Sequence, residues 1–570
     1  MQDTHSEQAS ASRGAGRARL KIGVLIDGFS QPAWIHSMLS GVASSGIAEI
    51  ALVVKKPEPP KPTPKRFARL RAIAAQILRP NLYGLYIQKD RARKVLRPDA
   101  FEHMDVREII GNARVLEVTP IEKGFSDYFD DADIDQILSY DLDVLLRVGF
   151  RILRGRILEC AKHGVWSHHH GDNNVNRGGP AGFWEVMEQH PCTGSILQVL
   201  SESLDAGKVI YRSYASTRFD SVAANKNNYY WKTSQFVLRK LRNLHELGAD
   251  ALTSLDQHYS PYSNRLYENP TNRQMLGLLG SLYNRKLHAR IAEKTSYDQW
   301  FIAFRFRKRL SDQNNAFYQY THVNPPKDRF WADPCPVRLD DKYWVFLEEY
   351  MYDTARGHIS VMQVNPDGTW SEPVPVLRRD YHLSYPYVFE YEGGFYMIPE
   401  SARNKTVELY ACDSFPDKWS FHSLLLSGMN AVDATVCAID GAWWMFVAQG
   451  VPGALNSDEL FLYYADSPLG PWKPHKRNPV KSDVRSARPA GRIFESNGRY
   501  YRPSQDCSRA YGWAISINQI AHISPDAYRE TEVSKILPHW APGLRATHTL
   551  NYAGDLGVID GLRRAPRFRI

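Results

Sequence analysis

The chain has 570 residues, which is too long for one ordinary domain and predicts several. Hydrophobic residues make up 43% and charged residues 23%. This composition supplies enough apolar side chain for large cores and excludes wholesale disorder and collagen-like repeats. The sequence has no long apolar run and no apolar signal region, and its six cysteines are scattered without CxxC pairs. We therefore expect a cytoplasmic protein in a reducing compartment.

The N-terminal part alternates between predicted strands and helices. Residues 1–19 are rich in Ser, Ala and Arg and predict a disordered tail. The apolar run 20–28 predicts a buried parallel strand, 32–45 predicts a helix, and 47–56 predicts the next strand. This alternation predicts a Rossmann-like α/β domain over 20–215 with a parallel sheet. The first loop lacks GxGxxG, so the usual dinucleotide fingerprint is absent.

A basic insertion interrupts this domain at residues 55–98. Thirteen Lys and Arg side chains and two acids lie in it, whereas the net charge of the whole chain is +9. Because the basic charge is confined to one segment, we predict no nucleic-acid partner. The segment begins as a Pro-rich spacer and continues with apolar residues at helical spacing among arginines. It is either a helix docked on its own domain or a contact to an anionic membrane surface or a phosphate-rich ligand, which would make the protein membrane-peripheral.

Residues 141–210 hold the densest group of candidate functional side chains. A strand is predicted over 141–150 and a helix over 151–164, followed by GVWSHHHGDNN, RGGPAGFW and SLDAGKVI. Histidine changes its charge near neutral pH, and a nearby carboxylate can orient it for proton transfer. The candidates in this stretch are Ser167, His168, His169, Asp172, Asn173, Arg177, Gly178 and Asp205.

In this order, the motifs resemble the formyltetrahydrofolate-dependent formyltransferases. DVLLRVGFRIL matches a strand and turn of that family, RGGPAGFWEVMEQHPCTGSILQ matches its central stretch, and SLDAGKVI matches its L-D-x-G-x-I ending. The resemblance implies formyltetrahydrofolate as one-carbon donor and an amine as acceptor. It places His169 and Asp205 at the catalytic histidine and aspartate, and Ser167 at the family's asparagine. The remaining candidates would bind substrate or donor: His168, Asp172, Asn173, Arg177 and Gly178.

Simpler interpretations of these residues stay open. Serine at position 167 cannot offer the amide donor that the family has there. The three histidines could form a solvated turn or a metal site, although we predict no metal. Asp205 could serve only to form a turn, and residues 177–180 could be only a loop that leads into a helix.

The second half of the chain differs in composition. Residues 216–296 predict a helical connector, with helices over 237–255 and 273–294. From 297 to 570 the sequence consists of aromatic-rich strands and turns, with a further strand at 299–307.

Five segments of this half share one pattern, a small or polar pair followed by an apolar strand and, in four of them, a turn and an aromatic strand. Their spacing is roughly fifty residues, the length of a four-stranded blade, and predicts an all-β five-bladed propeller. Strand 299–307 would close the ring with the last blade. The segments are 332–349, 384–401, 432–449, 487–505 and 546–561.

The opening residue of the first strand in each blade should face the central funnel. A rim position at the end of the next strand adds Glu348 and Glu400. Two carboxylates and an arginine in one pocket exceed what core packing needs, although Asp-Pro and Pro-Glu at strand ends also suit turns. The predicted funnel residues are Asp333, Tyr385, Asp433, Arg488 and either Thr547 or His548.

FWADPCP, SYPYVF with YMIPES, and VDATV resemble the five-bladed propellers of glycoside hydrolase family 43 and related proteins, including the N-terminal domain of plant glucosamine inositolphosphorylceramide transferases. In those hydrolases an Asp base, a second Asp and a Glu acid perform inverting hydrolysis. Asp333 matches the base, but Glu400 precedes Asp433, which reverses the hydrolase order. The resemblance therefore implies sugar binding more than hydrolysis.

These observations give three hypotheses. The first is an N-formyltransferase that acts on an amino sugar, nucleotide-linked or part of a glycoconjugate precursor, with the propeller holding carbohydrate. The alternative is glycosidase or glycosyl-transfer activity in the propeller, with a degenerate formyltransferase-like binding domain. The third is a non-catalytic assembly protein of surface-polysaccharide synthesis.

Overall fold

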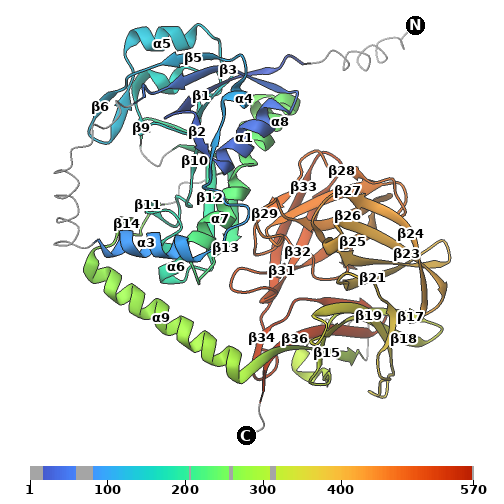
Figure 1. Ribbon diagram of the computed structural model, residues 1–570. Helices are drawn as coiled ribbons and strands as arrows, with labels where there is room; N and C mark the ends of the chain where they lie inside the picture. Colours follow the sequence, from blue (N-terminus) through green and yellow to red (C-terminus); the bar gives the residue numbers. More distant parts are fainter. Residues whose placement is uncertain (1–16, 59–80, 204–206, 256–260, 308–315, 568–570) are drawn as a thin grey trace, which may run out of the picture.

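The computed structural model describes residues 17–58, 81–203, 207–255, 261–307 and 316–567, and has an α/β half and an all-β half (Figure 1). The disordered tail predicted for 1–19, the helix predicted near 67–78 and Asp205 lie wholly or mostly outside the described residues. No helix within the described ranges is both long and apolar enough to cross a bilayer.

A seven-stranded sheet forms the centre of the α/β half, in the order β13-β12-β10-β8-β1-β3-β5. Five strands of this sheet, β1, β3, β5, β8 and β10, pair in parallel, as alternating predicted strands and helices imply. The sheet is nevertheless mixed, because β12 runs antiparallel to both β10 and β13. The strands are β1 (Leu20–Ile26), β3 (Ala48–Lys55), β5 (Arg114–Glu117), β8 (Val144–Arg147), β10 (Val165–His169), β12 (Cys192–Val199) and β13 (Lys208–Ser216).

Helices cover both faces of this sheet. One core joins the sheet to α1 (Ala33–Ala43), α7 (Val222–Thr233) and α8 (Phe236–Leu247), and a second core joins it to α5 (Asp131–Leu138). α7 and α8, from the predicted connector, thus share a core with the first strands. Shorter elements are β2 (Ser30–Pro32), α3 (Leu82–Arg93), β4 (His103–Asp105), α4 (Arg107–Ile110), β6 (Ile121–Lys123), β7 (Ser126–Tyr128), β11 (Arg177–Gly178), α6 (Trp184–Glu188), η2 (Ala249–Leu252) and β14 (Leu266–Tyr267).

The helix predicted over 151–164 is wrong. The chain forms a short strand, β9 (Ile152–Leu153), and a 3₁₀ turn, η1 (Gly155–Glu159). Asp127 accepts hydrogen bonds from the Arg151 backbone N–H at 2.8 Å and from Arg151 Nε at 2.7 Å, which fixes an extended start. Gly155 then has a φ of 77°, which no α-helical residue adopts.

Five antiparallel sheets make up the second half, one for each predicted repeat, so the propeller prediction is confirmed at the level of strand pairing. Four blades are β17 (Arg329–Leu339), β18 (Lys342–Met351), β19 (Arg356–Val364), β20 (Val374–Leu377); β21 (Ser384–Tyr391), β22 (Gly394–Ser401), β23 (Thr406–Ser414), β24 (Lys418–Ser427); β25 (Ala431–Ile439), β26 (Ala442–Gln449), β27 (Glu459–Ala465), β28 (Lys473–Pro474), β29 (Lys481–Ser482); and β30 (Phe494–Ser496), β31 (Arg499–Asp506), β32 (Ala514–Ile523), β33 (Tyr528–Ile536).

The fifth sheet joins the two ends of the propeller sequence. β15 (Ser296–Phe306) pairs antiparallel with β36 (Leu556–Pro566) along its whole length, so the predicted closing strand does close the ring. Such closure protects the edge strands of the first and last blades. The remaining strands of this sheet are β16 (Thr321–Val323), β34 (Leu544–Ala546) and β35 (Leu550–Ala553).

The two halves are linked by α9 (Asn272–Thr295), which runs from the α/β half to β15 (Figure 1), and by a polar interface. Val484 N–H donates to the carbonyl of Tyr214, a residue of the edge strand β13, at 3.1 Å. Lys232 Nζ lies 3.2 Å from Asp458 Oδ2, and both side chains are buried. These contacts hold the third and fourth blades against the α/β half.

Candidate functional site

The first strands of three blades place a side chain at the propeller axis by the same local distortion. Asp333, Tyr385 and Asp433 have φ values of 53°, 43° and 56°, which non-glycine residues rarely adopt. At each of them the pairing with the next strand shifts register. Such bulges redirect one side chain out of the pleat and are common at functional sites. The structure thus brings together these three predicted funnel residues.

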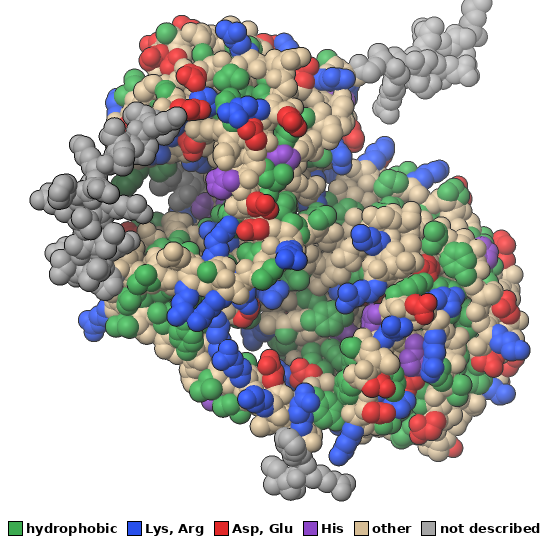
Figure 2. Space-filling model, in the orientation of Figure 1, with side chains coloured by type: hydrophobic (Ala, Val, Ile, Leu, Met, Phe, Trp, Pro, Cys, Tyr) green, Lys and Arg blue, Asp and Glu red, His purple; other side chains and the backbone are tan. Residues whose placement is uncertain are grey.

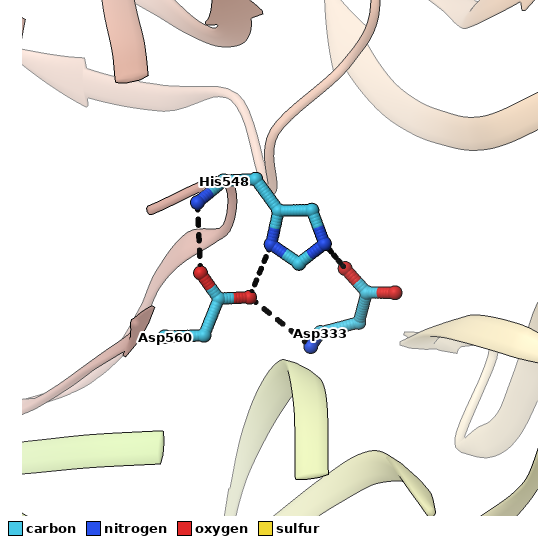
Figure 3. A group of neighbouring side chains, drawn as sticks. All are labelled: Asp333, His548 and Asp560. Carbon is cyan, nitrogen blue, oxygen red and sulfur yellow. Dashed lines mark hydrogen bonds and ion pairs between the residues drawn. The ribbon is translucent and has the colours of Figure 1, made fainter. Parts of the chain in front are cut away.

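Asp333 belongs to a buried network with the fifth blade (Figure 3). His548 lies between two carboxylates, with Nδ1 2.5 Å from Asp560 Oδ2 and Nε2 3.6 Å from Asp333 Oδ1. Thr549 Oγ1 donates to Asp333 Oδ1 at 2.7 Å, and the Trp300 ring stacks on His548 with centroids 4.0 Å apart. Burial lowers the pKa of His548, but Asp560 and Asp333 outweigh it and raise that pKa overall. The imidazole is therefore held as a cation between the two acids.

The same three residues offer one nitrogen and two oxygen ligand atoms within 4.8 Å of one another. A divalent cation that accepts mixed O and N ligands would bind this set only in place of the proton on His548, because a protonated imidazole has no free lone pair. The sequence predicted no metal, and Asp560 had not been singled out because the fifth repeat is degenerate after its turn.

A second group surrounds the arginine of the fourth blade. Arg488 Nε donates to Asp433 Oδ2 at 2.6 Å, and its Nη2 donates to Asp433 Oδ1 and to Glu400 Oε2 at 3.1 Å each. Gln505 Nε2 also donates to Asp433 Oδ2, at 2.9 Å. The Glu400 side chain is 13% exposed, against 2% for Asp433. Glu400 is thus the more accessible acid of this group.

Burial raises the pKa values of three acids at the axis, Asp333, Glu348 and Glu400. Burial, partly offset by His548, raises the pKa of Asp333 to about 6. Burial raises the pKa of Glu348 well above its usual range, and the charges of Asp333 and Glu400 add to this. Burial also raises the pKa of Glu400, although Arg488 opposes it. Glu348 and Glu400, whose pKa values are raised well above the usual range, are therefore the acids of this group that are suited to act as general acids, whereas Asp333 is mostly ionised at neutral pH.

Three of the residues predicted from the α/β half line a cavity of about 160 Å³ in that half. Ser167, His168 and His169 lie on its wall, and Arg147 Nη1 donates to Ser167 Oγ at 3.1 Å. The neighbouring His170 stacks on Tyr230 with centroids 3.7 Å apart. Burial lowers the pKa of His168 to about 4, and its Nε2 lies 3.1 Å from the Thr233 carbonyl. His168 and His170 are therefore neutral packing residues.

The other predicted ligand-binding residues of this half support its loops. Asp172 accepts a hydrogen bond from Tyr214 OH at 2.7 Å, and Asn173 Nδ2 donates to Gln198 at 3.2 Å. Arg177 Nε donates to the Asn173 carbonyl at 3.0 Å. Gly178 has a φ of 93°, and its strand β11 pairs with β14. Within the described residues, none of these four lines the cavity that holds His169.

Fold and site together define a multidomain protein in which an α/β half is joined to a five-bladed propeller with an acidic axis. Residues 319–550 match the family model described as glucosamine inositolphosphorylceramide transferase 1, N-terminal. Glucosamine inositolphosphorylceramide transferase 1 of Arabidopsis thaliana is 37% identical over 260 residues, 43% of this chain and 34% of that protein. Its counterpart in Oryza sativa subsp. japonica is 34% identical over 248 residues, 41% of this chain and 33% of that protein.

The chain therefore spans about a third of the length of the curated relatives it matches. Among solved structures, the catalytic domain of the GH62 alpha-L-arabinofuranosidase of Coprinopsis cinerea has a TM-score of 0.33 at 12% identity, covering 42% of this chain and 94% of that chain. The GH43_1 enzyme of Xanthomonas citri complexed with xylose has a TM-score of 0.31 at 14% identity, covering 42% of this chain and 87% of that chain. The fold assignment rests on the strand pairing above.

The comparisons overturn the prediction of formyl transfer. The matching relatives are named as glucosamine inositolphosphorylceramide transferases, and no formyltransferase family is supported for the N-terminal half. The assignments of a formyltransferase activity and of formyltetrahydrofolate as donor are therefore wrong. The physical reason is that short motifs of Gly, Pro and His also serve as loop and packing residues, as His168, His170 and Gly178 do here. The assignment of Ser167, His169 and Asp205 as catalytic residues stays a prediction, and Asp205 lies outside the described residues.

Proposed function

We propose that the propeller half binds the glycosyl part of a glycoconjugate and acts in a glycosyl-transfer reaction. The proposal rests on Glu400, because its carboxyl group is partly accessible, has a raised pKa and accepts a hydrogen bond from Arg488. The match of 319–550 to a transferase family supports a carbohydrate substrate. Because the matched relatives carry inositolphosphorylceramide in their name, we propose a glycolipid as acceptor.

The chemistry follows from the two acids that differ most in environment. A protonated Glu400 can donate its proton to the oxygen that leaves the anomeric carbon, while the acceptor hydroxyl forms the new bond to that carbon and releases its own proton to solvent. Asp333, with a pKa of about 6, is ionised at neutral pH and can stabilise positive charge that develops on the sugar ring. Arg488 orients Glu400 through the bond to its Oε2.

The direct test incubates the full chain with a panel of nucleotide sugars and an inositolphosphoryl lipid, and detects glycosylated lipid by mass spectrometry. Glu400→Gln keeps the size of the side chain but removes its proton, so turnover should fall by roughly 10²–10⁴-fold. The matched control is Glu390→Gln, an exposed glutamate on the same blade, which should retain activity. Equal activity in the wild type and Glu400→Gln would overturn the role of Glu400.

A second candidate function is sugar binding without turnover. It is favoured by the hydrogen bonds that the carboxylates of Asp333 and Asp433 already accept. Asp333 accepts from the Thr549 hydroxyl and the Tyr385 backbone N–H, and Asp433 accepts from the Arg488 and Gln505 side chains. Carboxylates that already accept several hydrogen bonds hold neighbouring groups in place more readily than they accept a proton from a substrate. Calorimetry that detects sugar binding, together with no product for any donor, would select this candidate.

We also propose that α9 contacts an anionic membrane surface, where a glycolipid acceptor would lie. Leu276, Tyr283, Leu287 and Ile291 are exposed, and their spacing places them on one helix face. Lys286, Arg290 and Lys294 are close to this stripe on the helix surface, and Figure 2 shows Lys and Arg side chains gathered over this part of the molecule. An apolar stripe beside basic residues is typical of helices that lie on anionic lipid.

A further inference from the structure

A second polar cavity, of about 280 Å³, lies where the two halves meet. The α/β half contributes β13, α8 and Leu255 to its wall, and the propeller contributes His475, the segment 477–482 and Tyr528. The cavity is therefore complete only when the halves are docked.

All charged side chains among the described residues that line this cavity are basic. Two of these basic side chains pair with glutamates that do not themselves line the cavity. Arg239 forms a two-pronged ion pair with Glu459, at 2.7 and 2.8 Å, and Lys481 Nζ lies 2.6 Å from Glu530 Oε1. Arg212 Nε lies 3.6 Å from Asp172 Oδ1. Lys240 and Arg477 remain, and no ion pair with an acid of the described residues accompanies them.

Lys240 is the central observation, because its charge is buried without a carboxylate. The residue is 7% exposed, and its Nζ donates to the Ala251 carbonyl at 2.9 Å. Burial, together with the positive charges of Arg477 and Lys208, lowers the pKa of this ammonium to about 8. A buried cation beside other cations is costly unless an anion completes the site. Arg477 is exposed at the rim, where it can meet such an anion.

We propose that this interdomain cavity binds a phosphoryl group, either free phosphate or the phosphate of a phosphorylated sugar. A tetrahedral dianion accepts hydrogen bonds from several donors at once, and lysine and arginine are the side chains that bind it. Lys240 supplies the ammonium from the α/β half, and Arg477 supplies the guanidinium from the propeller. The site goes beyond the proposed glycosyl transfer, because it lies apart from Glu400 and Arg488 and recognises charge instead of the sugar ring.

The test titrates the full chain by calorimetry at low ionic strength with inorganic phosphate, sulfate, glucose 6-phosphate and glucose. We expect both phosphoryl probes and sulfate to bind, glucose not to bind at this site, and affinity to fall as salt is raised. Tighter binding of glucose 6-phosphate than of phosphate would identify a phosphorylated sugar as the source. Tighter binding of phosphate would identify the free anion.

Lys240→Met should weaken phosphate binding at least tenfold, and Arg477→Gln should weaken it severalfold. Arg477 is exposed, so its variant tests the site even if Lys240→Met does not fold. The matched control is Lys476→Met, since Lys476 is exposed next to Arg477 and its Nζ lies 2.5 Å from Asp526 Oδ1. Absence of phosphate binding by the wild type would overturn the proposal, as would an equal loss in the control.

Discussion

At the scale of single residues, Glu530 is the acid whose ionisation contributes most clearly to stability. Burial opposes its charge, but Arg502 and Lys481 lower its pKa to about 2. Its stabilising contribution is therefore present above the unfolded value, near 4.3, and is lost as pH falls toward 2. We expect Glu530→Gln to cost ~3 kcal/mol at pH 7, because the buried Arg502 and the partly buried Lys481 lose their partner, and the difference to shrink below pH 4. Chemical denaturation at pH 7 and pH 3 measures both, with the exposed Glu532→Gln as control; a difference that does not change with pH would contradict the assignment.

At the scale of elements, α9 carries the membrane prediction. Leu287→Glu places a negative charge in the exposed stripe and should reduce flotation of the protein with phosphatidylserine-containing vesicles, because both the apolar contact and the attraction to anionic lipid are weakened. Leu424→Glu, at an exposed leucine of β24, introduces the same charge away from α9 and should float like the wild type. Vesicles of phosphatidylcholine alone should bind less. Flotation that does not depend on lipid charge or on Leu287 would contradict the role of α9.

The elements also explain which predictions succeeded. Repeat spacing located the blades because every blade must bury the same aromatic strands, and so Asp333, Asp433 and Arg488 could be placed at the axis. Asp560 was missed because the fifth repeat is degenerate after its turn, and it contacts His548 only through the folded ring. The packing of His168 on Trp34 and of His170 on Tyr230 could not be predicted from the sequence, because it is a tertiary property.

At the scale of the whole molecule, the buried pair of Lys232 and Asp458 tests how firmly the halves are docked. Lys232→Met leaves Asp458 buried without its cation, which should cost ~3–5 kcal/mol and lower the melting temperature. Adding Asp458→Leu removes the stranded charge and should recover much of the loss, whereas independent sites would give additive losses. Thermal unfolding of the two single variants and the double variant measures this coupling.

Because the phosphoryl cavity is shared by both halves, a loosened interface should also weaken phosphate binding in Lys232→Met, although Lys232 does not line that cavity. Unchanged phosphate affinity in a clearly destabilised Lys232→Met would show that the docking of the halves and the anion site are independent.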